Sequence, residues 1–265
     1  MQFYLGLMKV YLVNGASNVQ AMFRASNKVS SDIFFLMIQE HIWNSTSEDF
    51  AKFANDKTGR LKLPANPFPD AEKAEKMAEV PEQKRYWATM HETFHRYLNR
   101  TDESNALARS YQRFFGQRLD SKFPLDGTKA PVCIYQFLLQ DMAESAATAI
   151  NGSRILELNP DIMKLVWDFD VIAASLVWGL PKFLNRESWR KRDRLIAATR
   201  RYLEVALNEF DLSQGAEGEE DPDWEPIFGS RLTRELVRWM KESGFAMQTM
   251  AGALTNFTLF GYERH

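Results

Sequence analysis

The residues best suited by type and spacing to bind a metal or to catalyse a reaction are two histidines and a glutamate in the segment HETFH. On a helix, His91 and His95 would share one face, where they could ligate zinc while Glu92 acts as a general base. A catalytic zinc ion needs three protein ligands. Leu98 and Thr101 occupy the positions where an extended zinc motif has glycine and histidine. The pattern therefore favours a helix whose histidines serve another purpose, with zinc-dependent hydrolysis as the alternative.

Cys133 is the single cysteine of the chain, so no internal disulfide can form and a reducing, intracellular compartment is expected. Among its neighbours in the sequence, only Lys129 would favour a thiolate. We therefore expect a small buried apolar residue rather than a nucleophile. Glu144 could supply a third zinc ligand, although nothing in its surroundings marks it for that role.

Residues 186–201 (RESWRKRDRLIAATRR) are predicted to form a basic amphipathic helix. Such a helix could contact an anionic membrane surface, and the alternative is a solvated basic face without a partner. The side chains predicted to face apolar groups are Trp189, Leu195 and Ile196. Those predicted to face outward are Arg190, Lys191, Arg192, Arg194 and Arg200.

The spacing Glu-x-x-Arg is a second charged pattern, and on a helix it gives an i, i+3 ion pair worth a few tenths of a kcal/mol. It occurs at Glu82 and Arg85, at Glu187 and Arg190, and at Glu235 and Arg238. Because it recurs along one chain, the spacing alone does not identify a site.

The elements that must position these residues are mostly helices, because apolar side chains recur at i, i+3 and i+4. The one predicted strand spans residues 9–13 and is followed by an Asn-Gly turn. Asn159 and Ser230 are predicted to cap the helices that follow them. The predicted helices span residues 16–24, 31–43, 84–98, 102–119, 132–150, 161–174, 186–210, 230–243 and 245–260. Irregular or solvated segments are expected at residues 63–69, 70–82 and 215–224.

Composition restricts the class of protein. The net charge of −2 gives no reason to expect a nucleic-acid partner. No run approaches the roughly 20 apolar residues that cross a bilayer, and the opening residues do not resemble a signal peptide or an anchor. Aromatic residues make up 13% of the chain, which suits either a large flat apolar ligand or simply an aromatic core. No linker divides the chain, so residues 1–265 are expected to form one domain.

Several segments, taken in order, resemble fungal cytochrome P450 proteins, in particular those related to sterol and bile-acid-type hydroxylases. They are KVYLVNGASNVQAMFRASNKVSSDIFFLMIQE, FAKFANDKTGRL, ASLVWGLPKFLN, WEPIFGSRLTRELVRWMKESGF and MAGAL. The resemblance covers residues 9–259. It implies an all-α fold with a small β element, arranged as the N-terminal half of the cytochrome P450 fold. It also implies haem as cofactor, a lipophilic sterol-like or fatty-acid-like substrate, a reductase partner and, for full-length members, the endoplasmic reticulum membrane.

The resemblance also assigns roles to particular residues. Trp87 and His91 stand at the spacing of a family pair that binds a haem propionate, with His91 in place of the more usual arginine. Residues 161–174 and 186–210 correspond to the helices that roof the substrate pocket and touch the membrane. Residues 245–260 correspond to the first half of the central helix that crosses the haem. The residues assigned to substrate on that helix are Ala253, Phe257 and Phe260.

Two family features have no counterpart in these residues: the later Glu-x-x-Arg helix and the loop F-x-x-G-x-x-x-C-x-G that supplies the thiolate. Cys133 does not replace it, because Gly127 lies too far upstream and Tyr135 stands where glycine is needed. The sequence is therefore expected to be a partial domain, truncated before the haem-thiolate loop and inactive alone. A non-catalytic helical interaction module is the other alternative.

Overall fold

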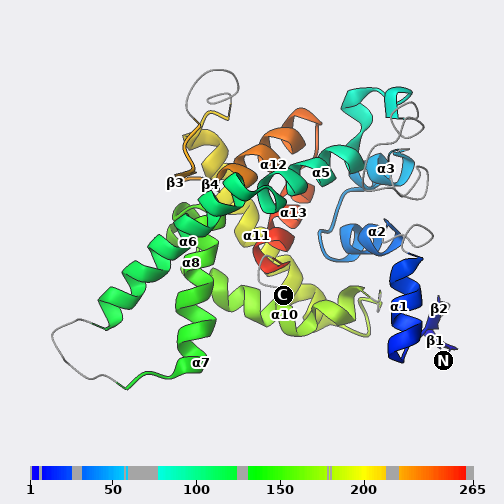
Figure 1. The fold of residues 1–265 in the computed structure, drawn as a ribbon, viewed down its shortest axis with the longest axis horizontal. Coiled ribbons are helices and arrows are strands. Elements are labelled where there is room, and N and C mark those ends of the chain that lie inside the picture. The colour runs from blue at the N-terminus through cyan, green and yellow to red at the C-terminus, as the bar shows by residue number, and fades with distance from the viewer. Residues whose placement is uncertain are drawn as a thin grey trace.

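The computed structural model describes residues 2–5, 8–25, 32–56, 58, 77–123, 131–177, 179, 181–212 and 221–260. Within these ranges the chain is mainly helical with two short antiparallel hairpins, which confirms the expected fold class (Figure 1). The α-helices are α1 (Ala16–Arg24), α2 (Asp32–His41), α3 (Ser47–Asn55), α5 (Tyr86–Phe94), α6 (Thr101–Lys122), α7 (Ile134–Phe137), α8 (Ala143–Asn151), α9 (Arg154–Leu158), α10 (Ile162–Val177), α11 (Arg186–Glu209), α12 (Arg231–Glu242) and α13 (Met247–Phe260). A 3₁₀ turn, η2 (Glu82–Lys84), and two π-helical segments, η3 (His95–Asn99) and η4 (Leu138–Met142), complete the helical set.

The N-terminal elements form a small unit beside the helices. Strands β1 (Gln2–Leu5) and β2 (Met8–Tyr11) pair antiparallel, with Phe3 opposite Val10. The predicted strand at residues 9–13 overlaps β2, whereas its partner β1 was not predicted. Helix α1 has the predicted bounds, but none of its side chains is buried. Helix α1 therefore adds no buried side chain to the main core.

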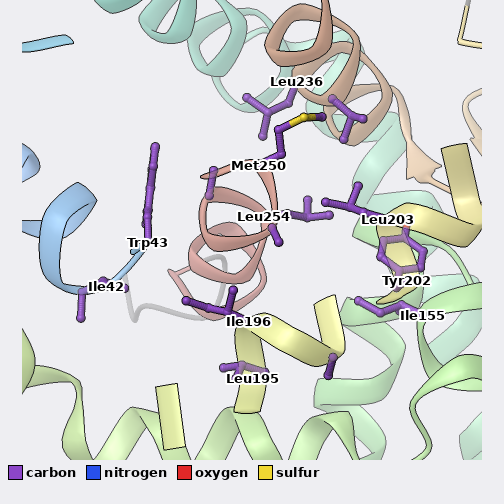
Figure 2. Packing of buried hydrophobic residues seen from close by; sticks show 14 of the residues in the cluster. Ile42, Trp43, Ile155, Leu195, Ile196, Tyr202, Leu203, Leu236, Met250 and Leu254 are labelled. Atoms are coloured by element: carbon purple, nitrogen blue, oxygen red, sulfur yellow. The ribbon is translucent and has the colours of Figure 1, made fainter. Parts of the chain in front are cut away.

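The core lies around α11, which packs against α10 on one side and α13 on the other (Figure 2). Within one buried cluster, Ile196 and Leu203 of α11 lie toward α13, which contributes Met250 and Leu254. Leu195 lies on the opposite side of α11, toward α10. Fully burying an aliphatic side chain of this size contributes about 1.5–3 kcal/mol. Apolar packing along α11 is thus the main force that places α13.

Polar contacts close the far end of this core. The Tyr202 hydroxyl lies 2.8 Å from the carbonyl oxygens of both Asn151 and Ile227, which share its single proton. Burial, and then the charge of Glu225, raise the pKa of Tyr202 well above its ordinary value. Gly152 has φ +84°, and a Cβ there would lie 2.3 Å from the Pro226 carbonyl oxygen. Only glycine combines that conformation with so close an approach, so α8 ends directly against the hairpin of β3 (Trp224–Glu225) and β4 (Gly229–Ser230).

Local sequence signals set several boundaries as predicted. The Ser230 side chain accepts a hydrogen bond from the Thr233 N–H and caps α12. Asn159 differs from the prediction, because α10 begins at Ile162. The Asn159 side chain instead accepts a hydrogen bond from Arg201 at 2.8 Å. Helices α3 and α9 were not predicted, since each is short. The irregular segment expected at residues 63–69 lies outside the described residues.

Helix α6 runs antiparallel to the segment formed by α7, η4 and α8, and together they form an arm that projects from the body (Figure 1). The root of the arm is buried: Ser145 and Ala147 of α8 have no exposed surface. Its outer end is held by ring contacts of Phe137 with Phe115 and Phe123, at centroid distances of 5.5 and 6.0 Å. The arm is therefore a helical hairpin whose tip is far more exposed than its root.

Candidate functional site

The central feature of the candidate site is the start of α13, which α3 holds in place. The Asp49 carboxylate accepts a hydrogen bond from the Ala246 N–H at 3.0 Å, just before α13 begins. The Thr46 N–H donates to the Thr249 hydroxyl at 3.2 Å. Burial alone would raise the pKa of Asp49, but the hydrogen bonds that it receives, first that of Lys52, hold the pKa below its ordinary value of 3.8. A negative charge at a helix N-terminus is also stabilised by the helix dipole.

The Lys52 side chain, also on α3, donates hydrogen bonds to backbone carbonyls just after the end of α12. Its ammonium donates to the carbonyl oxygens of Ser243 and Gly244 at 3.2 and 2.6 Å. It also contacts the Asp49 carboxylate at 2.8 Å and lies 4.4 Å from the centre of the Phe245 ring. One ion pair on α3 therefore binds both the two carbonyls that directly follow α12 and the N–H that directly precedes α13.

The middle of α13 packs directly against backbone. A Cβ at Gly252 would lie 1.9 Å from the Trp43 carbonyl oxygen, so only glycine fits this approach. The next residue, Ala253, has no exposed surface, and the Thr255 hydroxyl lies 2.9 Å from that of Thr199 on α11. The side chains of Phe257 and Phe260 lie outside the described residues. The assignment of Ala253, Phe257 and Phe260 to substrate stays a prediction.

Trp87 lies on α5 and connects α5 to α3. Its indole N–H donates to the Phe53 carbonyl at 2.8 Å, and its backbone N–H donates to Asp56 at 2.7 Å. Its ring lies 5.0 Å from that of Phe35 and 5.3 Å from that of Phe53. The donor assigned to a haem propionate thus has a protein acceptor in this structure, while His91, one turn on, is exposed. The pairing of Trp87 and His91 with haem stays a prediction.

The HETFH segment places both of its histidines at the surface. His91 and His95 are exposed, and His95 begins the π segment η3. The Glu92 carboxylate lies 3.5 Å from Arg100. Glu144, weighed as a third ligand, pairs with Arg118 at 2.5 Å. In the ranges that the structure describes, no group of three or more histidine, cysteine, aspartate or glutamate side chains could hold a metal.

Cys133 corrects an expectation, because it is exposed rather than buried. It immediately precedes α7, at the tip of the arm and away from α13 (Figure 1). Its surroundings in the sequence are apolar, and that composition suggested a core position. The structure instead places this apolar segment at the surface.

Arg192 on α11 is a second correction, because its side chain is buried and does not face outward. Its guanidinium donates to the His41 carbonyl at 2.8 Å, at the end of α2, and stacks 4.4 Å from the centre of the Trp189 ring. A cation at a helix C-terminus interacts favourably with the helix dipole. The position shares a face with the buried Ser188 and Leu195, at spacings of four and three residues, and this spacing was the available signal.

The Glu-x-x-Arg spacing gives two ion pairs as expected. Arg190 lies 2.5 Å from Glu187, and Arg238 lies 2.6 Å from Glu235. At the remaining occurrence, Arg85 donates to the Val80 carbonyl at 2.8 Å. The spacing thus describes local helix contacts and marks no common site.

Arg234 on α12 is a buried, charged residue whose importance was not predicted from the sequence. It has no exposed surface, and its guanidinium lies 2.9 Å from Asp221 and donates to the Gly229 carbonyl at 2.6 Å. It also donates to the Pro222 carbonyl and lies 3.8 Å from Glu225. These contacts connect residues 221–230 to α12. Two of its partners, Asp221 and Pro222, lie in residues 215–224, which were predicted to form an acidic loop, and nothing in that composition indicated the contact.

Comparison with known proteins gives a consistent result. A cytochrome P450 monooxygenase of Penicillium decumbens, calL, is 38% identical over 260 residues, which cover 98% of this chain and 46% of that relative. Another of Humicola fuscoatra, fsoE, is 32% identical over 121 residues, covering 43% of this chain and 20% of that relative. A third, efuG of Hormonema carpetanum, is 26% identical over 117 residues. No protein-family model and no solved structure matches. The chain thus spans about half the length of the first relative.

Proposed function

The chain belongs to the cytochrome P450 family, and we therefore propose that its residues form a partial domain of a monooxygenase that acts on a lipophilic substrate. The observation that carries this proposal is the 38% identity to calL along 98% of the chain. That match covers 46% of the relative. We accordingly propose that oxidation requires the remaining part of the family domain, together with an electron-donating reductase.

Haem is the cofactor that the family implies, and it would supply the oxidation chemistry. We propose that the described residues do not form a haem-thiolate centre on their own. Cys133 is exposed at the tip of the arm, and the Trp87 indole N–H already donates to Phe53. We therefore derive no catalytic step from these residues. What they do is position α13, through Asp49, Lys52 and the close approach at Gly252.

The proposed substrate is sterol-like or fatty-acid-like, and the composition of the central segment supports this class. Residues 245–260 (FAMQTMAGALTNFTLF) contain no ionisable side chain. A helix of this kind gives an apolar ligand an apolar wall, and it offers no charge to bind an ionic one. We propose that Ala253, Phe257 and Phe260 contribute to that wall, and Ala253 would do so only after a change in the packing that leaves it without exposed surface in this structure.

Peripheral membrane contact is proposed for the connection between α10 and α11. Phe183 and Leu184 are 75% and 68% exposed there, next to the basic residues Lys182 and Arg186. Exposed apolar side chains beside cations favour an anionic lipid surface. None of the helices in the described ranges is both long and apolar enough to cross a membrane. We expect Phe183→Glu to weaken sedimentation of the protein with anionic vesicles, and unchanged sedimentation would contradict this contact. A location at the endoplasmic reticulum is a separate proposal, made from the family alone.

The function is tested by a hybrid in which this chain replaces the matched stretch of the Penicillium decumbens relative. We expect the reduced hybrid to show the red-shifted carbon-monoxide band of a thiolate-ligated haem, and to respond spectrally to a sterol or a fatty acid. The 265-residue chain given haem should show no such band. A folded hybrid without the band would refute the proposed function. A band in the chain alone that disappears in Cys133→Ser would refute our account of the ligand.

A further inference from the structure

The dipeptide Asn-Gly occurs at residues 14–15 and again at residues 151–152. The residue before each pair is β-branched, Val13 in the first case and Ile150 in the second, and the residue after each pair is small. The local chemistry of the two pairs is therefore closely matched. Their surroundings differ, because the first pair lies in the turn between β2 and α1, whereas the second lies where α8 meets the hairpin of β3 and β4.

An asparagine followed by glycine can lose its side-chain amide without a catalyst. The glycine backbone nitrogen gives up its proton and forms a bond to the side-chain carbonyl carbon of the asparagine. The bond from that carbon to the amide nitrogen breaks, and the nitrogen takes up a proton and leaves as ammonia. Water then opens the imide ring at either carbonyl, which gives aspartate or isoaspartate. Glycine favours this ring because it has no side chain to obstruct it.

The first pair meets the structural requirements of this reaction. Asn14 and Gly15 are exposed, and the preceding Val13 is 41% exposed. A Cβ built on Gly15 would meet no atom closer than the Asn18 side-chain nitrogen at 3.8 Å, so the turn has room for the ring. In the described part of the chain, the Gly15 N–H has no hydrogen-bond acceptor. The Asn18 side chain donates to the Asn14 carbonyl at 2.9 Å, which polarises that peptide and makes the Gly15 N–H more acidic.

The second pair fails each of these requirements. Asn151 has no exposed surface, so its side chain is shielded from water. The Gly152 N–H donates to the Thr148 carbonyl at 2.9 Å, and this hydrogen bond occupies the nitrogen that would attack. A Cβ built on Gly152 would lie 2.3 Å from the Pro226 carbonyl oxygen, so the surrounding backbone leaves no room for a ring. This pair can react only after local unfolding, and the free energy of that opening slows the reaction.

We propose that Asn14 is a site of spontaneous deamidation and that the fold protects Asn151 from the same reaction. The proposal does not depend on monooxygenase activity. Both products place a carboxylate just before α1, whose N-cap Gly15 makes no side-chain hydrogen bond and whose first turn has no acidic residue. The aspartate product should support α1, because negative charge is favourable near a helix N-terminus. The isoaspartate product instead lengthens the backbone between β2 and α1 by one carbon atom.

The test compares the two pairs within one molecule. The soluble monomer of the 265-residue chain is incubated at pH 8, and mass spectrometry of its peptides measures the replacement of an amide by a hydroxyl group at each asparagine. We expect residue 14 to react at least about tenfold faster than residue 151, because each ~1.4 kcal/mol of opening free energy slows the reaction tenfold. In concentrated urea the two rates should become similar, since the structural protection is then lost.

Asn14→Gln is the matched variant, because its side chain is also an amide but would have to close a larger and less favourable ring. During the same incubation the wild type should gain one negative charge on anion-exchange chromatography, and the variant should not. Equal rates at residues 14 and 151 in native buffer, or no reaction at residue 14, would overturn the proposal. So would a rate at residue 14 that rises about tenfold in urea, because the folded turn would then obstruct the reaction.

Discussion

The region around α13 and the tip of the arm differ in whether their side chains and backbone groups have partners among the described residues. At α13, Asp49 and Lys52 come from a distant helix and complete the hydrogen bonding of the neighbouring helix ends. At the tip, Ile134 and Tyr135 are 71% and 70% exposed, and the one charged residue of the segment 131–142, Asp141, is buried. The first region finds its partners within these residues, whereas the second lacks a cover among the described ones. Stability should therefore depend strongly on the first region and weakly on the second.

The largest effect is expected for Arg234→Met, which tests whether buried polar partners decide stability. The substitution leaves Glu225 and the Gly229 carbonyl without their cation and leaves Asp221 with Arg231 alone, 3.6 Å away. Breaking such a pair costs about 3–5 kcal/mol. Urea unfolding monitored by circular dichroism measures the change. Arg190→Met is the control, because its pair with Glu187 is exposed and should contribute less than about 1 kcal/mol. Equal losses of unfolding free energy in the two variants would show that the buried ion pair is no more important for stability than the exposed one.

Gly252→Ala is expected to cost about 3 kcal/mol, because the added methyl group meets the Trp43 backbone and α13 must shift. The control is Gly116→Ala on α6, where a Cβ meets nothing within 4 Å. There alanine should be neutral, or stabilising by up to about 1 kcal/mol, since it favours a helix more than glycine does. The same unfolding measurement applies. If Gly252→Ala is as stable as the wild type, α13 is not seated as described.

Asp49→Asn is expected to cost about 2 kcal/mol at neutral pH, the range for a lost charged hydrogen bond. The folded pKa of Asp49 lies below its ordinary value of 3.8. Its contribution is therefore complete above the unfolded pKa and is lost as pH falls through the folded pKa. The difference between wild type and variant should narrow below about pH 4. A difference that stays constant from pH 7 to pH 3 would show that the charge is not responsible.

The smallest effect is expected at the tip of the arm. Ile134→Gln should change the free energy of unfolding by less than about 0.5 kcal/mol, because the side chain is already in water. It should nevertheless lower the fluorescence of a hydrophobic dye, since the exposed side chains of Ile134, Tyr135 and Leu138 form a candidate dye-binding surface. We expect the wild-type chain to bind such a dye and to be prone to aggregation. A dye-silent, cooperatively unfolding monomer would contradict the contrast between the two regions.

Local physical chemistry in the sequence determined much of the helical frame. The bounds of α1 match the predicted ones, and Ser230 caps α12 as expected, because a capping oxygen acts on an N–H only three residues away. The apolar periodicity likewise predicted α10 and α11, whose buried faces repeat every three or four residues, whereas α13 is buried at every position from 249 to 256. The family resemblance also came from the sequence, as extended likeness along these segments.

Only the tertiary structure decided which polar residues matter. Arg192 meets a carbonyl 151 positions away in the chain, and Asp49 meets an N–H 197 positions away. No local pattern encodes such a partner, because the contact exists only after α2, α3, α11 and α13 have packed. The same reason explains the exposed Cys133 and the buried Arg234: composition predicts an average environment, whereas burial depends on which element arrives to cover it.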